Sequence, residues 1–252
     1  MKTKRETKQL FGMGVVFVLL LGSCLAESSQ KLRVGNQPGV VETASNDSVF
    51  IHMRDYKVYA SKFSGNVENG DCGLVNFDID FGSPENADSG KIKGFRTVSV
   101  IKFDTVPRHT LLTAAALELT DSSIVVPNEQ LVSSLEQRNT LVGDVYFLFS
   151  VHSRQDSLPL HFNLSYNPDY APPRNEQNQP VYDLFYRVIK EVGASPQPTA
   201  PTKYYNAFDL KQLIDATQGD SLFFRIRYAR SYNKDTTQIN WASSDVYRYG
   251  IK

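Results

Sequence analysis

Cysteine is almost missing from this sequence. The 252 residues include only Cys24 and Cys72, and Cys24 lies directly behind an apolar N-terminal run. A disulfide framework of the kind that stabilises small exported domains is therefore not expected within one chain. Cys72 has no histidine or basic cluster beside it, which favours a small buried residue over a reactive thiol. Stability must come from an apolar core, and about 200 residues are enough to build one.

Net charge and the common catalytic motifs are missing as well. Basic and acidic residues both number 27, so no broad positive field is available to attract nucleic acid. No G-x-S-x-G, H-E-x-x-H or phosphate-binding glycine-rich pattern occurs. The four histidines are scattered, which argues against a zinc site. We therefore expect neither an enzyme nor a nucleic-acid partner.

The N-terminus has the three regions of an export signal. Basic residues precede an apolar run at residues 11–21, and small residues follow up to Cys24. The run is shorter than the roughly 20 apolar residues that span a bilayer. Leu21-Gly22-Ser23-Cys24 resembles the bacterial lipobox, in which the cysteine is diacylated and becomes the first mature residue. We expect a signal peptide at residues 1–23 and lipidation of Cys24. An ordinary cleaved signal, which needs no cysteine, is the alternative.

The rest of the chain divides into a polar stretch and a strand-rich stretch. Residues 24–48 are polar and show no sustained apolar period, which predicts a flexible tether. Residues 49–252 predict one all-β domain, an antiparallel jelly-roll-like β-sandwich with one or two short helices. In that part, short β-branched and aromatic segments alternate with turns rich in Gly, Asn, Asp and Pro. The expected strands are residues 49–60, 73–77, 98–103, 114–120, 144–151, 160–164, 221–228 and 238–242.

Three segments have helical spacing. Residues 127–138 place Leu131, Val132 and Leu135 on one side of a predicted helix. Residues 209–215 predict a helix that begins with Asp209 as its N-cap. Residues 181–192 have the same spacing, but their aromatic and β-branched content suits a strand equally well.

One part of the sequence resembles a known module. Residues 94–123, GFRTVSVIKFDTVPRHTLLTAAALELTDSS, resemble the central motif of DNRLRE-type modules: a strand ending in Lys102-Phe103-Asp104, a turn with Pro107, then Ala-x-Leu-x-Leu. Residues 55–73 and 208–214 are similar to other parts of such modules. The resemblance implies a jelly-roll β-sandwich of exported bacterial proteins, similar to some carbohydrate-binding modules, and implies no catalytic residues.

Two groups of side chains are candidate sites. Aromatic rings stack on sugars while polar groups bond their hydroxyls, and five tyrosines beside loop residues are expected to be exposed. These are Tyr166, Tyr170, Tyr204, Tyr205 and Tyr232. The acidic loop at residues 76–90 offers oxygen ligands for calcium, with Asp78, Asp80 and Asp88 as candidates, although the spacing is not that of an EF-hand. No other cofactor is expected.

Together these patterns predict an outer membrane lipoprotein on the periplasmic face or the cell surface. We expect a non-catalytic β-sandwich that binds polysaccharide or another glycan and contacts the membrane through its N-terminal lipid. A structural or adhesive surface protein is the alternative, and an exposed apolar patch would favour it. A polysaccharide-degrading enzyme would instead need paired carboxylates, or a Tyr/His/Arg cluster with shifted pKa values, in a cleft.

Overall fold

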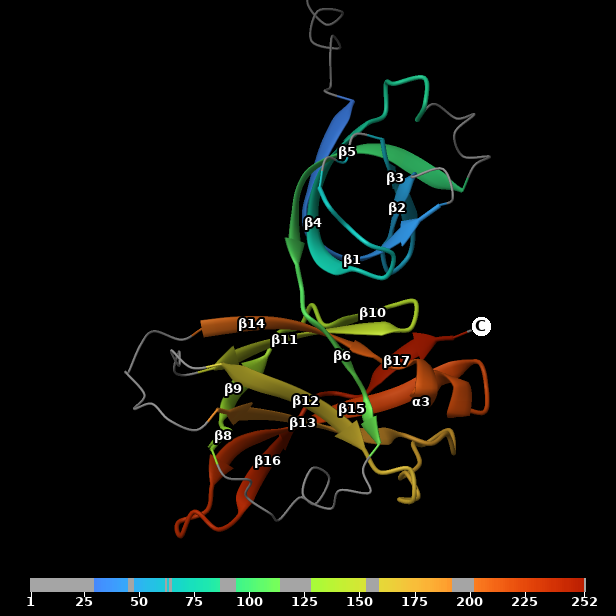
Figure 1. Cartoon of the computed structure of the whole chain (residues 1–252). Helices are drawn as coiled ribbons and strands as arrows, with labels where there is room; N and C mark the ends of the chain where they lie inside the picture. The colour runs from blue at the N-terminus through green and yellow to red at the C-terminus, as the bar shows by residue number, and fades with distance from the viewer. Residues whose placement is uncertain are drawn as a thin grey trace, which may run out of the picture.

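The chain folds into a barrel and a pair of sheets, one above the other (Figure 1). The computed structural model describes residues 30–44, 48–61, 63, 65–86, 94–113, 128–152, 159–191 and 202–251. Strands dominate these ranges, and the helical part is the short α3 (Lys211–Ala216). The predicted all-β class is confirmed. Nowhere in the described part is there a helix long and apolar enough to cross a membrane.

The N-terminal unit is a closed five-stranded barrel in the order β1-β2-β3-β5-β4. Its strands are β1 (Lys31–Thr43), β2 (Val49–His52), β3 (Lys57–Ala60), β4 (Cys72–Asp80) and β5 (Phe95–Thr105). The pair β3 and β5 is parallel, and the other neighbours are antiparallel. Alternate residues of each strand point inward, so Ile51, Val58 and Phe77 fill the interior with no exposed surface.

Strand β1 lies where the sequence predicted a tether. Two features of β1 interrupt the alternation of apolar and polar residues by which a strand is recognised. The register against β4 shifts between Val34 and Gln37, and Asn36 has a positive φ of 51°, so the inward and outward positions change places at this bulge. Gly39 follows, and an added Cβ there would lie 2.6 Å from Ile51 Cγ2. Position 39 points inward and has room only for glycine. It therefore lacks the apolar side chain that is typical of an inward position in a strand.

The C-terminal unit consists of two sheets packed face to face. The first contains β10 (Thr140–Val142), β11 (Val145–His152), β14 (Thr202–Asp209) and β6 (Arg108–Thr110), with β9 (Val132–Leu135) on β11. The second contains β16 (Ile239–Ser243), β15 (Ser221–Tyr232), β13 (Tyr182–Lys190), β12 (Leu160–Tyr166) and β7 (Leu112–Thr113), with β17 (Tyr247–Gly250) on β15 and β8 (Glu129–Gln130) on β13. Most pairs are antiparallel, but β6 with β14, β7 with β12 and β13 with β15 are parallel.

The barrel sits on the outer face of the first sheet. In β11, Tyr146 and Leu148 point into the core between the sheets, while Phe147 and Phe149 belong to a separate cluster with Cys72 and Leu74 of the barrel. All four β11 side chains are fully buried. Because both faces of β11 are covered, its sequence is apolar at nearly every position instead of alternating.

Three expectations about helices have different outcomes. The helix predicted at residues 127–138 is wrong, because β8 and β9 occupy its described part. Here Glu129 forms a fully buried 2.9 Å ion pair with Arg187 of β13 and Val132 enters the core, so tertiary pairing overrides the local spacing. The helix expected at residues 209–215 is confirmed as α3, but its predicted N-cap is wrong, because Leu210 and not Asp209 occupies the N-cap position. Asp209 lies one residue earlier, where its Oδ1 accepts a hydrogen bond from the Lys211 backbone N–H at 2.9 Å. The ambiguous segment at residues 181–192 is strand β13.

Two strand expectations also differ from the structure. Residues 49–60 form the hairpin β2–β3 instead of one strand, because the chain turns at Arg54 and Asp55. The strand expected at residues 114–120 lies outside the described residues.

Replacing Phe147 by alanine should destabilise the protein by about 3–5 kcal/mol, because the cavity would open in the packed contact between barrel and sheet. Urea denaturation of residues 25–252 measures the effect. Tyr170→Ala is the matched aromatic control, since its side chain is 63% exposed, and it should change the free energy of unfolding by less than about 0.5 kcal/mol. Equal stability of the two variants would contradict the burial of Phe147.

Candidate functional site

The five candidate tyrosines have different environments. Tyr166 is 6% exposed and belongs to the core, so its predicted exposure is wrong. Its strand, β12, continues to Tyr166 and directs the ring inward. Tyr170 is exposed, and Tyr232 is half-buried with its hydroxyl donating to the Glu129 carbonyl at 2.7 Å. Tyr204 and Tyr205 line a common hollow.

That hollow is a groove of about 550 Å³ at the junction of barrel and sheets. We call it the junction groove. Its barrel side includes Asn36, Lys102 and Asp104, and its sheet side includes Arg138, Phe162, Lys203, Tyr204, Tyr205 and Asn206. The groove follows from the pairing of β14, because β6 pairs with this strand only from Ala207 onward. The preceding residues of β14 are consequently left at a sheet edge.

Tyr204 and Tyr205 do not form one flat platform. The Tyr204 ring lies 4.9 Å from the His152 ring and 5.3 Å from the Phe162 ring, between the sheets. The Tyr205 ring lies 5.1 Å from Phe149, on the face that the barrel covers. Neighbouring residues of a strand point to opposite faces, so each tyrosine contributes separately to the wall of the groove.

Charged side chains surround these rings. The Arg138 guanidinium lies 5.1 Å from the centre of the Tyr205 ring, within the range of a cation–π contact. Arg138 and Lys203 both bond Glu136, at 2.6 and 2.7 Å. Burial of Glu136 would raise its pKa, but these hydrogen bonds outweigh burial and lower the pKa below its usual value. Glu136 is therefore ionised at neutral pH.

Behind the groove lies a buried polar cluster. Ser150 Oγ is 3.1 Å from His152 Nε2 and 3.0 Å from the Tyr186 hydroxyl. Burial lowers the pKa of His152 to about 4 and raises that of Tyr186. Ser150 and Tyr186 have no exposed surface and His152 is 2% exposed. The cluster combines residue types that catalyse hydrolysis elsewhere, yet a substrate cannot reach these atoms in this arrangement.

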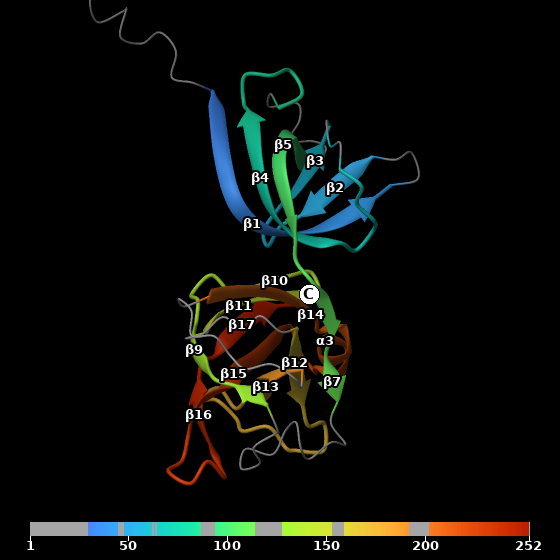
Figure 2. The same ribbon diagram turned by 60° about the vertical axis from the view of Figure 1, so that its left-hand side comes forward.

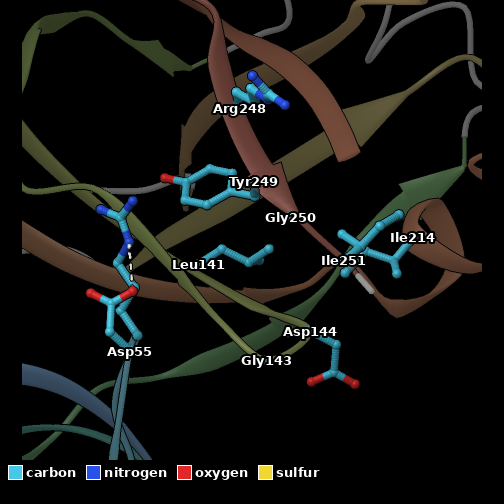
Figure 3. A pocket seen from close by; sticks show the side chains of 10 residues that line it. Asp55, Leu141, Gly143, Asp144, Ile214, Arg248, Tyr249, Gly250 and Ile251 are labelled. Carbon is cyan, nitrogen blue, oxygen red and sulfur yellow. Dashed lines mark ion pairs between the residues drawn. The ribbon is translucent and has the colours of Figure 1, made fainter. Parts of the chain in front are cut away.

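A second cleft, of about 600 Å³, lies at another side of the junction (Figure 3). Arg54 and Asp55 of the β2–β3 turn line it together with residues of β10, α3 and β17. The Arg54 guanidinium lies 5.7 Å from the centre of the Tyr249 ring, and burial raises the pKa of Tyr249 to about 12. Figure 3 shows the side chains of Asp144 and Arg248 pointing away from each other. The polar groups of this cleft do not converge on a common point.

An aromatic cluster on the barrel was not recognised from the sequence. Phe50, Tyr59 and Phe95 have ring centres 5.2 to 5.9 Å apart, and Lys57 Nζ lies 4.4 Å from the centre of the Phe50 ring. The rings are half-buried on the outside of β2, β3 and β5. Phe50 and Tyr59 were visible within the expected strand, but only the turn between β2 and β3 places them opposite each other.

Two of the three calcium candidates, Asp78 and Asp80, form ion pairs. Arg33 bonds both carboxylate oxygens of Asp78, at 2.9 and 3.0 Å, and thereby lowers the pKa of this carboxyl. Asp80 lies 3.7 Å from Lys31 Nζ. Asp88 lies outside the described residues. Within the described ranges, no three His, Cys, Asp or Glu side chains are grouped as metal ligands, so calcium binding stays a prediction.

Of the two cysteines, only Cys72 lies among the described residues. Cys72 is buried, as expected, and burial raises the pKa of its thiol to about 11. Such a thiol is protonated at neutral pH and has little nucleophilic character. Cys24 lies outside the described residues.

The barrel order β1-β2-β3-β5-β4 is that of a five-stranded Greek-key barrel. Residues 29–104 match the family model described as the lipoprotein OB domain. The matched residues coincide with the barrel and include most of β5. The resemblance of β5 to a DNRLRE-type module stays a prediction. The match supports an exported, membrane-anchored protein, in agreement with the lipobox-like signal. The outer membrane and its face stay predictions.

Solved structures resemble both units together. An uncharacterised protein from Parabacteroides merdae aligns with a TM-score of 0.71 and 19% identity, covering 88% of this chain and 99% of its own. A candidate lipoprotein from Bacteroides fragilis aligns with a TM-score of 0.56 and 11% identity, covering 88% and 99%. A NigD-like immunity protein from Bacteroides caccae aligns with a TM-score of 0.52 and 11% identity, covering 90% and 99%. At these identities the likeness shows the fold alone. No curated protein sequence matches the chain significantly.

Acidification should destabilise the protein between about pH 6.5 and pH 4. In this window the unfolded chain protonates His152, whose ordinary pKa is 6.5, while the folded state, with a pKa of about 4, does not. The full loss is about 3 kcal/mol. Stability against pH, measured by urea denaturation, should fall less steeply for His152→Gln. His161→Gln is the matched control at a mostly exposed position. A parallel pH dependence in wild type and His152→Gln would refute this assignment.

Proposed function

We propose that the chain is a lipid-anchored, exported protein without catalytic activity that binds glycan in the junction groove. The observation that carries the proposal is the convergence of Tyr204, Tyr205 and Arg138 in a hollow of about 550 Å³. This volume lies within the usual range of small-molecule sites. Sugars present C–H faces that pack on aromatic rings and hydroxyls that bond amide and charged groups, and the groove offers both.

The charge of the groove favours acidic sugars. Lys102, Arg138 and Lys203 supply three cations, while Asp104 and Glu136 supply two carboxylates that pair with them. These five side chains together carry one net positive charge. A sugar carboxylate or sulfate can bond a guanidinium or ammonium group directly, which adds a charge-assisted hydrogen bond to the contact with the rings.

The absence of catalysis is proposed on chemical grounds. A glycoside hydrolase needs one carboxylic acid that is kept protonated by a raised pKa. Both carboxylates near the groove bond cations, and the pKa of Glu136 is lowered instead of raised. The Ser150 and His152 pair is enclosed in the core.

The barrel cluster of Phe50, Tyr59 and Phe95 is the rival ligand surface. The face of strands 2 and 3 of an OB-fold binds oligosaccharides in other proteins. In this chain the three rings pack edge-on or tilted against one another, and Lys57 covers the Phe50 ring. Less of each ring face is therefore free to stack on a sugar.

A glycan array probed with residues 25–252 tests the proposal. Acidic polysaccharides should be retained without release of products, and Tyr205→Ala and Arg138→Ala should each weaken binding at least tenfold. Tyr59→Ala, the matched aromatic control on the barrel, should leave affinity unchanged. Thermal melting verifies that each variant is folded.

Three outcomes would contradict the proposal. Loss of binding in Tyr59→Ala but not in Tyr205→Ala would move the site to the barrel. Release of shorter sugars would identify an enzyme. Failure to retain any glycan would favour the structural or adhesive role in protein contacts.

A further inference from the structure

Strand β1 begins close in sequence to the predicted lipid anchor. Lys31 starts β1 and Cys24 lies seven positions before it. At about 3.5 Å per residue, the intervening chain reaches at most about 25 Å. Figures 1 and 2 show that β1 begins at the end of the barrel farthest from the two sheets. A diacylated Cys24 would therefore hold this end of the barrel near the lipid surface.

The same end of the barrel exposes apolar side chains. Lys31 pairs with Asp80 and Leu32 with Ile79, and the Phe81 backbone N–H donates to the Gln30 carbonyl at 2.8 Å. In this register Leu32, Ile79 and Phe81 share one face of the β1–β4 ladder. Ile79 is part of the barrel core, but Leu32 is 49% exposed and Phe81 is 44% exposed. The core-facing row thus continues past the rim of the barrel into solvent.

Two ion pairs lie near this rim. Arg33 pairs with Asp78, and Lys31 lies near Asp80. The Arg96 guanidinium lies 5.7 Å from the centre of the Phe81 ring. Because carboxylates pair with Lys31 and Arg33 and weaken their fields, the apolar side chains of Leu32 and Phe81 would supply the main attraction to a membrane.

We propose that the rim formed by Leu32 and Phe81 docks on the lipid bilayer to which Cys24 is anchored. This inference rests on the lipid anchor of the proposed function and is independent of glycan binding. The junction groove lies at the opposite end of the barrel, where β4 begins and β5 ends. Docking would orient the two sheets and the groove away from the membrane. A flexible anchor alone would fix the distance to the membrane but not this orientation.

The test uses the full chain, processed and lipidated in a bacterial host. It is reconstituted in vesicles of 70% phosphatidylethanolamine and 30% phosphatidylglycerol, with and without a nitroxide on the lipid headgroup. Mass spectrometry verifies diacylglycerol on Cys24. A fluorophore is attached to Gln30→Cys or, as the distal control, to Tyr170→Cys, in a Cys72→Ala background. We expect the nitroxide lipid to quench Gln30→Cys at least threefold more strongly than Tyr170→Cys.

The double variant Leu32→Ser/Phe81→Ser separates docking from tethering. It should lower the quenching at Gln30→Cys at least twofold, whereas Ile101→Ser, a 52% exposed position elsewhere on the barrel, should not. All these side chains are exposed, so the variants should fold, and thermal melting verifies this. Equal quenching with and without the rim residues would overturn docking while leaving the anchor intact. A mature chain without diacylglycerol on Cys24 would overturn the anchor and the docking together.

Discussion

The contact between the barrel and the outer face of the first sheet supports the rest of the structure. Val145, Phe147 and Phe149 of β11 pack against Cys72 and Leu74 of β4, and all five side chains are buried. An apolar interface of this kind excludes water and holds two units in one arrangement. The junction groove lies at the margin of this contact, so its shape depends on the packing behind it.

The groove is also supported from the interior of the sandwich. His152 contacts the Tyr204 ring and, through Ser150, is connected to Tyr186 in the opposite sheet. Buried polar groups that are hydrogen-bonded in this way restrict the rotamers of their neighbours. The role of this cluster is therefore structural, because it positions the Tyr204 wall of the groove. The low pKa of His152 is a consequence of the same burial.

Some elements of this fold can be predicted from local sequence, and others depend on distant pairing. Strands such as β11 and β15 could be predicted because their β-branched and aromatic content is local information. Strand β1 was missed because the bulge at Asn36 and the inward Gly39 interrupt its period. Residues 127–138 were assigned to a helix because spacing alone does not show that Glu129 will pair with Arg187, 58 positions away. For the same reason, the sequence identified Tyr204 and Tyr205 as candidates but also included the buried Tyr166.

The sequence by itself determined the features that depend on neighbouring residues: the all-β class, helix α3, the order of an export signal and a thiol without an activating neighbour. Tertiary structure decided the closure of the barrel, the covered outer face of β11, the edge of β14 that opens the groove and the exposed end of the β1–β4 ladder. The physical reason is that periodicity records which face of a strand is apolar. It does not record which distant strand pairs with it or what covers that face.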